Sequence, residues 1–446
     1  MKTAGLLAAL LGITASVAGA QATTGRECRL DVQGYDSTRM SRYTSAAGKT
    51  TLFVGGGYRA RCAGTHIIVT SDSAEYAEDL GDLRLIGHAH YEEDSASVDA
   101  DVIQYLQREE HIVAAGNVVA KSRTKITLMA AQAHYYRPIP GTRAYVSITA
   151  FGGRPHLIIR DSAKTASDSD ATLIDADRIH TERDSLFYAG GNVVITRPDM
   201  IGTADSADAN SSSHRARLIG GKPHLDGRGT RKFALDARGI DLYGTEKQVD
   251  RLFAKGGAVA VSDSLRLTAD TLNIRLSNNR IDTVMAWGPG RAHAVSPDRD
   301  ITANRLKLTM PGGQMQEVFA VGSARADTKA DSTLKTTERD WIVGDTLIAT
   351  FDKLAQGDTS QPKIRVLVSR GSARTFYQMQ SKSRTDSLPS LNYSAGRQIT
   401  VAFLRGAVDE VHVTGPAVHG ISLEPLSADT AKTAPKKKPP QPGQQP

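Results

Sequence analysis

The hydrophobic residues of this chain recur at alternate positions in short runs, with little sign of helical spacing. The runs are rich in Val, Ile, Thr and Ala, and Gly, Asp, Asn and Ser separate them. A side-chain period of two is typical of β-strands, and Gly and Asx residues are typical of the turns between strands. The sequence therefore predicts an all-β protein built from many short strands.

Two short elements recur along the chain and define a repeat. The first is a Gly that opens an alternating strand, and the second is Ala-Asp, or a close variant, followed by apolar residues at alternate positions. Copies of the first begin at Gly87, Gly116, Gly152, Gly191, Gly220, Gly257, Gly290, Gly322, Gly371 and Gly415, and copies of the second include Ala100-Asp101, Ala176-Asp177, Ala204-Asp205 and Ala269-Asp270. Units of this size cannot bury an apolar face alone, so stacked units are predicted to share one continuous core.

The alternation after each Gly predicts which side chains point inward. Residues two apart lie on the same face of a strand, so the aliphatic positions separate from polar ones such as Asn117 and Lys121. The predicted inward set is Val118, Ala120, Val193, Ile195, Val259, Val261, Ala292, Ala294, Ala324 and Ala326. The change from Val and Ile to Ala along this set predicts more interior space toward the C-terminus.

The polar positions of the repeat do not form a recognisable catalytic or metal-binding motif. The Asp of the Ala-Asp element is expected to cap a turn by accepting bonds from backbone N–H groups. His88 and His90 have a spacing that can ligate a metal, but the matching positions in other copies are Asn, Arg and Ser, which favours an exposed polar face. The sequence contains no G-x-S-x-G, P-loop or C-x-x-C motif. We therefore expect no enzymatic activity, no metal site and no cofactor.

The two ends of the chain differ from the repeats between them. Residues 1–20 contain Lys2, an apolar stretch and the small residues Ala18-Gly19-Ala20, which is the pattern of a cleaved signal peptide. Residues 21–49 are predicted to be an N-terminal extension, and residues 50–426 hold the repeats, in one array or in two consecutive modules. Residues 427–446 are rich in Pro and Lys, a composition that predicts a disordered tail.

The charge balance bears on possible binding partners, and the two cysteines bear on disulfide formation. The formal net charge is +7. Lys2 and four tail lysines account for much of it, which leaves 50 Lys and Arg against 47 Asp and Glu over residues 21–426. A balanced surface does not predict nucleic-acid binding. Cys28 and Cys62 are the two cysteines, and they form either a disulfide, which an exported protein permits, or two buried thiols.

The repeat resembles that of a known family. Gly-Asn-Val-Val at 116–119 and at 191–194, each with an Ala-Asp strand downstream, is similar to the repeat of the OstA-like/LptA family of periplasmic lipopolysaccharide-transport proteins, and also to LptC and the N-terminal domain of LptD. The resemblance extends over about residues 50–420. It implies an open β-jellyroll, a slab of stacked antiparallel strands.

The same resemblance implies a function and a location. The apolar groove of the slab would shield the acyl chains of lipopolysaccharide or a related amphiphile. Edge strands would bind other Lpt-type domains or further copies of this chain. The protein would be exported to the periplasm, where an association with the outer membrane stays open.

Two other hypotheses fit the glycine rhythm. A parallel β-helix that binds or cleaves extracellular polysaccharide would need three sheets per coil, stacked Asn or aromatic ladders and a clustered acidic site. A structural envelope scaffold without a ligand would need none of these.

Overall fold

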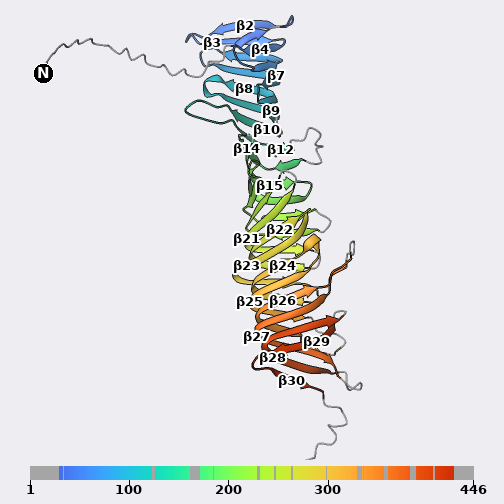
Figure 1. Cartoon of the computed structure of the whole chain (residues 1–446). Helices are drawn as coiled ribbons and strands as arrows, with labels where there is room; N and C mark the ends of the chain where they lie inside the picture. Colours follow the sequence, from blue (N-terminus) through green and yellow to red (C-terminus); the bar gives the residue numbers. More distant parts are fainter. Residues whose placement is uncertain are drawn as a thin grey trace, which may run out of the picture.

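The strands of the described chain belong to one antiparallel sheet. The computed structural model describes residues 30–33, 35–122, 126–160, 171–183, 185–228, 232–245, 248–262, 265–297, 299–328, 334, 336–355, 360–381, 388–404 and 407–425. Within these residues the sheet is 30-stranded, and its strand pairs are antiparallel throughout. The strands follow one another along an elongated slab, from the N-terminal end to the C-terminal end (Figure 1). The prediction of an all-β slab of antiparallel strands is confirmed, and a parallel β-helix is excluded for this part of the chain.

The strands fall into three stretches of the sequence. The first holds β1 (Leu30–Gln33), β2 (Arg39–Thr44), β3 (Thr50–Gly55), β4 (Tyr58–Cys62), β5 (Ile68–Ser71), β6 (Ser73–Ala77), β7 (Asp82–Glu92), β8 (Ala96–Leu106), β9 (His111–Ser122) and β10 (Ile126–Tyr136). The second holds β11 (Ser147–Phe151), β12 (His156–Ile159), β13 (Thr172–Asp175), β14 (Arg178–Glu182), β15 (Leu186–Thr196), β16 (Met200–Asn210), β17 (Arg215–Ile219), β18 (His224–Gly227), β19 (Phe233–Asp236) and β20 (Gly239–Gly244). The third holds β21 (Val249–Ser262), β22 (Leu265–Ser277), β23 (Arg280–Val295), β24 (Arg299–Thr309), β25 (Glu317–Thr328), β26 (Trp341–Phe351), β27 (Ile364–Gln380), β28 (Pro389–Leu404), β29 (Ala407–Thr414) and β30 (His419–Leu423). Short 3-10 turns occupy Gln107–Glu109 and Pro311–Gly313.

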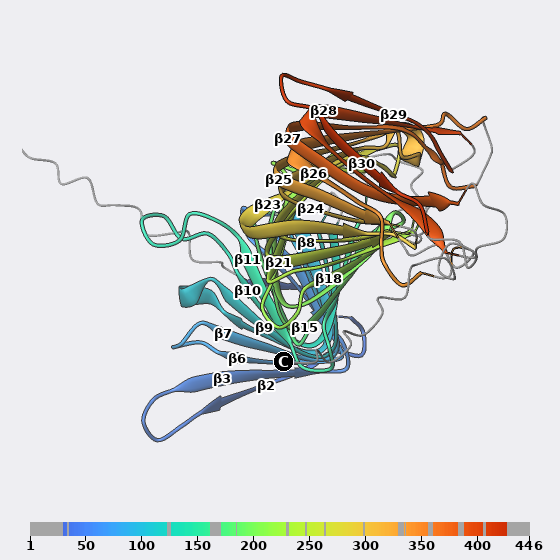
Figure 2. The same cartoon turned by 90° about the horizontal axis from the view of Figure 1, so that it is seen from below.

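The sheet is folded into two half-sheets that face each other across the core. Half-sheet I contains β2, β3, β6, β11, β14, β17, β20 and β29, and half-sheet II contains β1, β4, β5, β12, β13, β18, β19 and β30. Long strands such as β9 and β21 bend in the middle and run through both. The strands fan out in the view along the slab, because the slab twists along its length (Figure 2). We call the long side opposite the bends, where the turns of the two half-sheets face each other, the mouth.

A glycine bulge produces each bend, as the β9 copy shows. Gly116 has φ 78 and Asn117 has φ 48, and the pairing with β10 jumps from Ala115 and Gln132 to Val118 and Ala130. Two residues in the left-handed region turn the chain without ending the ladder, a conformation that Gly adopts without steric cost. Seven of the ten repeated glycines lie inside long strands, and the expectation that they open a strand is wrong for these seven, whereas Gly152, Gly220 and Gly415 lie between two strands.

The Asp of the Ala-Asp element packs against this bend from the neighbouring strand. A Cβ on Gly116 would lie 2.2 Å from Oδ2 of Asp101, and the same contact recurs between Gly191 and Asp177 at 2.3 Å. The carboxylate of Asp101 accepts a hydrogen bond from Nδ2 of Asn117 at 3.0 Å. These carboxylates bond to side chains, not to the backbone N–H groups that the sequence led us to expect, because the bulge brings the Asn amide directly over them.

The described sheet begins before the repeats were predicted to start. β1 and β2 lie within the segment predicted as an extension, and they pair with β4 and β3. Cys62 is buried and disulfide-bonded, whereas Cys28 lies outside the described residues, so their pairing stays a prediction. The predicted signal peptide and tail also lie outside the described residues.

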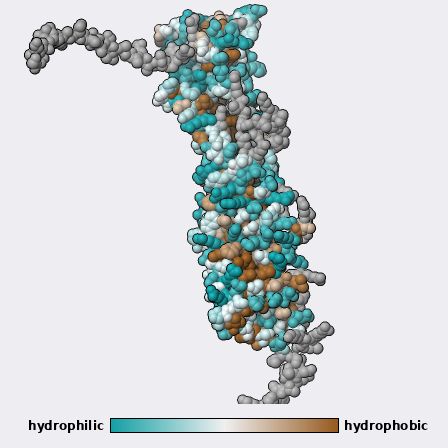
Figure 3. Space-filling model, viewed as in Figure 1, coloured by the Kyte–Doolittle hydropathy of each residue, from teal (hydrophilic) through white to brown (hydrophobic). Residues whose placement is uncertain are grey.

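The surface of the slab is mixed in character. The face shown in Figure 3 is hydrophilic over most of its length, with hydrophobic side chains gathered over its C-terminal third. The residues that the structure describes include no helix with the length and apolarity of a membrane span.

Candidate functional site

Two adjoining cavities open at the mouth in the N-terminal and central parts of the slab. The first has a volume of about 420 Å³, and residues between Ser95 and Arg183 line it. The second has a volume of about 200 Å³, and residues between Ile126 and Val249 line it. Ile126 contributes to both, so the cavities are neighbours along the slab.

The walls of both cavities are apolar and come from the two half-sheets. In the larger cavity, Val98 and Leu128 of half-sheet II face Ile148 of half-sheet I. In the smaller cavity, Ile174 and Ile195 of half-sheet II face Leu242 of half-sheet I. These side chains sit at the inward positions of their strands, next to a core that continues to the bends. Each cavity is thus the outer part of the interior, left unfilled where the half-sheets splay apart.

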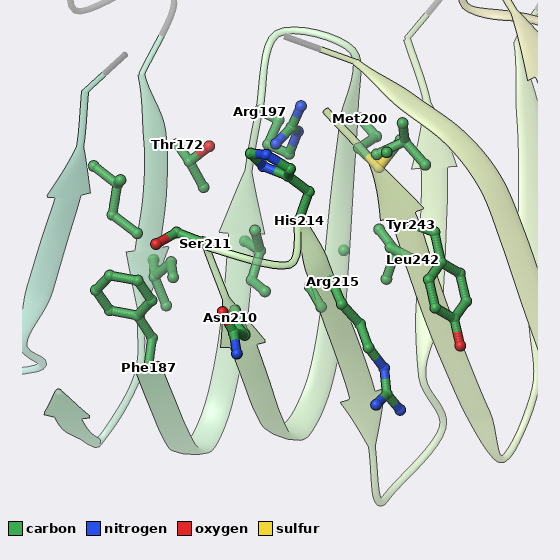
Figure 4. A pocket seen from close by; sticks show the side chains of 18 of the residues that line it. Thr172, Phe187, Arg197, Met200, Asn210, Ser211, His214, Arg215, Leu242 and Tyr243 are labelled. Carbon is green, nitrogen blue, oxygen red and sulfur yellow. The ribbon is translucent and has the colours of Figure 1, made fainter. Parts of the chain in front are cut away.

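Basic and polar residues form the rim of the smaller cavity. Arg160 and Arg197 follow strand ends of half-sheet II, and His214 belongs to the turn between β16 and β17 of half-sheet I. Figure 4 shows Arg197 and His214 at one end of the cavity, with Phe187 and Met200 along its walls. The site therefore combines an apolar trough with basic side chains at its entrance, of which Arg197 is paired with Asp199, and this suits a ligand with an apolar body and a polar head.

A buried polar network closes the mouth on the N-terminal side of the cavities. Nε of Arg137 lies 2.8 Å from Oε2 of Glu93, and Nη1 of the same guanidinium contacts Glu110. Glu93 follows β7 on half-sheet II, whereas Arg137 and Glu110 flank strands of half-sheet I. The guanidinium thus joins the two half-sheets across the mouth.

Three core tyrosines complete this network. Tyr91 donates to Glu93 at 3.0 Å, Tyr135 also donates to Glu93, and Tyr105 donates to Glu110 at 3.1 Å. Burial raises the pKa of Glu93, but the hydrogen bond from Tyr135 and the charge of Arg137 outweigh it, and the pKa of Glu93 is held below its usual value. Glu93 therefore remains ionised at neutral pH inside the closed mouth.

A second polar contact spans the mouth on the C-terminal side of the cavities. Asp199 lies in the turn between β15 and β16 of half-sheet II, and its Oδ2 accepts a hydrogen bond from the backbone N–H of Val249 at 3.3 Å. Nε of Arg197 donates to Oδ1 of the same carboxylate at 3.0 Å. Val249 begins β21 on half-sheet I, so this bond also joins the two half-sheets. The cavities lie between the two closures.

Eight of the ten predicted inward residues do point inward, and they divide into three groups in the structure. Ala120 lines the larger cavity and Ile195 lines the smaller one. Val118 and Val193 point inward but lie deeper, each 1% exposed. Ala292, Ala294, Ala324 and Ala326 are packed in the core, so the expectation of more space toward the C-terminus is wrong for these positions. Leucines on the facing half-sheet, including Leu272, Leu306 and Leu347, pack in the same core and compensate for the small alanines.

Val259 and Val261 were assigned to the wrong face. The inward residues of this strand are Ala258 and Ala260, and Ala260 pairs with the buried Leu235 and Leu267. The bulge glycine here is Gly256, which packs against Arg238, so Gly257 takes the place that Asn117 has in β9. Counting from Gly257 shifted the expected alternation by one residue and therefore reversed the faces.

The sequence did not indicate the residues that close and rim the mouth. Glu93 and Arg137 are 44 residues apart and occupy turns with no repeat signal. Asp199 and Val249 are 50 residues apart. The mouth-facing position of a turn depends on how the two half-sheets meet, which strand periodicity does not encode.

The fold defines an all-β slab with an apolar interior that is partly open along one side. No family model matches the chain, and no curated protein matches it. Among solved structures, the chain is similar to LptH, the LptA-homologous periplasmic component of the lipopolysaccharide transport device from Pseudomonas aeruginosa. The match has 12% sequence identity and a TM-score of 0.25, and it covers 28% of this chain and 93% of LptH.

Proposed function

We propose that this protein shields the acyl chains of an anionic amphiphile of the lipopolysaccharide type in the cavities at its mouth. The supporting observation is the position of two adjoining apolar cavities at the open side of the slab, with Arg160 and Arg197 on the rim. Each acyl CH₂ removed from water contributes about 0.8 kcal/mol, so a trough of this kind binds lipid tails without specific polar contacts.

The size and openness of the site fit a carrier. The larger cavity, at about 420 Å³, is within the range of roughly 300–1,000 Å³ that ligand pockets occupy. Both cavities reach the surface between turns, so a lipid tail would enter sideways while its head stays in water. A carrier makes and breaks no bond, and the proposal assigns no catalytic role to any residue.

The proposal includes an exported, periplasmic location and partners at the two ends of the sheet. β2 pairs only with β3 among the described strands, and β30 pairs only with β28. Unpaired strand edges of this kind accept a further strand from another chain, so Lpt-type domains or other copies of this chain would add there.

A cavity-filling substitution tests the site. Ala216 lines the smaller cavity, so Ala216→Phe should occupy it and weaken binding of a fluorescent lipid A analogue about tenfold, while far-UV circular dichroism stays unchanged. Ala234→Phe is the matched control, because Ala234 pairs with Val261 on the outer face of half-sheet II and should leave binding unchanged. Equal binding by Ala216→Phe and the unaltered chain, with both folded, would contradict the assignment.

A further inference from the structure

The outer face of half-sheet I carries a basic and apolar surface between β21 and β28. Side chains that are directly opposite on neighbouring strands share one face of a sheet. Lys255 is opposite Thr271, Thr271 is opposite Trp287, and Trp287 is opposite Arg305. The rows built in this way contain the cations Arg251, Lys255, Arg275, Arg305, Lys307 and Arg370. We call this surface the basic face.

The rows that hold these cations contain a single carboxylate between β21 and β28. Glu317 is the one acidic residue in these rows of the described strands, at the position opposite Thr309 and Thr350. None of the six cations forms an ion pair within the described chain. Two of them donate to neutral amides, with Nε of Arg251 3.0 Å from Oδ1 of Asn273 and Nε of Arg370 3.1 Å from Oε1 of Gln398.

The outer face of half-sheet II at the same level is different. Arg325 pairs with Asp327 at 2.5 Å, and Arg339 pairs with Asp300 at 2.9 Å. Carboxylates therefore neutralise part of the positive charge on this side of the slab, whereas all six cations of the basic face are without an ion pair in the described chain. Uncompensated charge on one face favours an anionic partner at that face.

Apolar side chains lie between the cations. They are Phe253, Met285, Trp287, Phe319, Ile348 and Val368, and Met285 is 37% exposed. The rings of Phe253 and Trp287 are 6.0 Å apart, and Nζ of Lys255 is 4.6 Å from the centre of the Phe253 ring. Nucleic-acid bases and sugars stack on aromatic rings, but Met, Ile and Val offer no stacking surface. A mixture of cations, Trp and aliphatic residues is instead typical of surfaces that contact lipid head groups and the adjoining acyl region.

We infer that the basic face is a docking surface for an anionic lipid bilayer. The slab lies on the membrane through half-sheet I of β21 to β28, with the cations at the phosphates and Trp287 at the level of the head groups. This surface is separate from the mouth cavities, which residues 95–249 line. Docking would hold the slab beside a membrane without a membrane-spanning segment.

The test uses residues 21–446 with Trp341→Phe, which leaves Trp287 as the sole tryptophan. Vesicles of phosphatidylcholine with about one third phosphatidylglycerol should sediment the protein, shift the Trp287 emission to the blue and allow its quenching by brominated lipid. Vesicles of phosphatidylcholine alone should do none of these. Each cation near an anionic membrane surface strengthens binding about fivefold. Arg305→Gln with Lys307→Gln should therefore lower partitioning into the anionic vesicles about tenfold to thirtyfold.

The matched control removes two cations from the opposite outer face. Arg266→Gln with Arg374→Gln changes the net charge by the same amount and should change partitioning less than about twofold. Equal losses in the two double variants would overturn the inference, since they would show a general charge effect. Binding to the anionic vesicles without any change in Trp287 emission would also overturn it, because another surface would then contact the membrane.

Discussion

The slab has two regions that share one bend motif but differ in how their interior ends at the mouth. Over residues 93–249 two cavities leave the interior partly empty, and polar residues such as Ser95, Thr172 and Asn210 are among those that line them. Beyond Val249, buried apolar residues continue to the strand ends of half-sheet I, at Leu276, Ile281, Met310 and Ile364.

The comparison shows that the bend motif sets the architecture but not the opening. Gly116 against Asp101 and Gly371 against Asp345 make the same close contact in the two regions. The side chains nearest the mouth decide whether the two half-sheets seal against each other. Polar side chains at that position keep water contact and cannot fill the gap, so the polar contacts of Glu93 and Asp199 hold the half-sheets together instead.

The largest expected effect comes from breaking the N-terminal closure. Arg137→Met leaves Glu93 buried and without its cation, which should destabilise the region around β7 to β10 by about 3–5 kcal/mol. Hydrogen exchange should rise in peptides from residues 91–137 and remain unchanged in peptides from residues 265–310. Arg84→Met is the control, because the Arg84 and Glu75 pair is solvent-exposed and contributes at most about 1 kcal/mol. A small effect of Arg137→Met would show that the closure is dispensable.

A smaller difference is expected between core truncations in the two regions of the slab. Leu272 is 0% exposed in the sealed region, so Leu272→Ala should cost about 3 kcal/mol through lost burial and a new cavity. Ile195 is partly buried and already borders a cavity, so Ile195→Ala should cost about 1–2 kcal/mol. Urea denaturation of both variants measures the difference. Equal losses of stability would mean that the interior around Ile195 is packed as tightly as the C-terminal core around Leu272.

The smallest effect should appear on acidification. The pKa of Glu93 is lowered in the folded protein, so its ionised form contributes stability above the ordinary carboxyl pKa of about 4.5. That contribution is lost as the pH falls through the lower folded pKa. In an acid titration, the near-ultraviolet signal of Tyr91, Tyr105 and Tyr135 should therefore change before the emission of Trp287 and Trp341. Glu93→Gln should abolish this lead, and simultaneous changes in the unaltered chain would contradict the assignment.

The sequence alone determined the fold class and most of the inward face. A period of two, broken at regular intervals by Gly and by Ala-Asp, is sufficient to predict stacked strands with one apolar side. The sequence correctly placed five residues inward: Val118, Ala120, Val193, Ala292 and Ala324. Each of their strands contains a Gly-x pair that marks the bend, so the alternation can be counted from that pair. Local chemistry dictates local alternation, so these inferences need no long-range information.

Tertiary structure decided the rest. In β21 the consecutive glycines Gly256 and Gly257 leave two possible bend positions, and only pairing with Leu235 and Leu267 shows that Ala260 points inward while Val259 and Val261 point outward. The cavities, and the contacts of Arg137 and Asp199 that bound them, depend on which turns meet across the mouth. Those turns are about 45 to 50 residues apart, and their meeting is set by the splay of two half-sheets rather than by any local pattern.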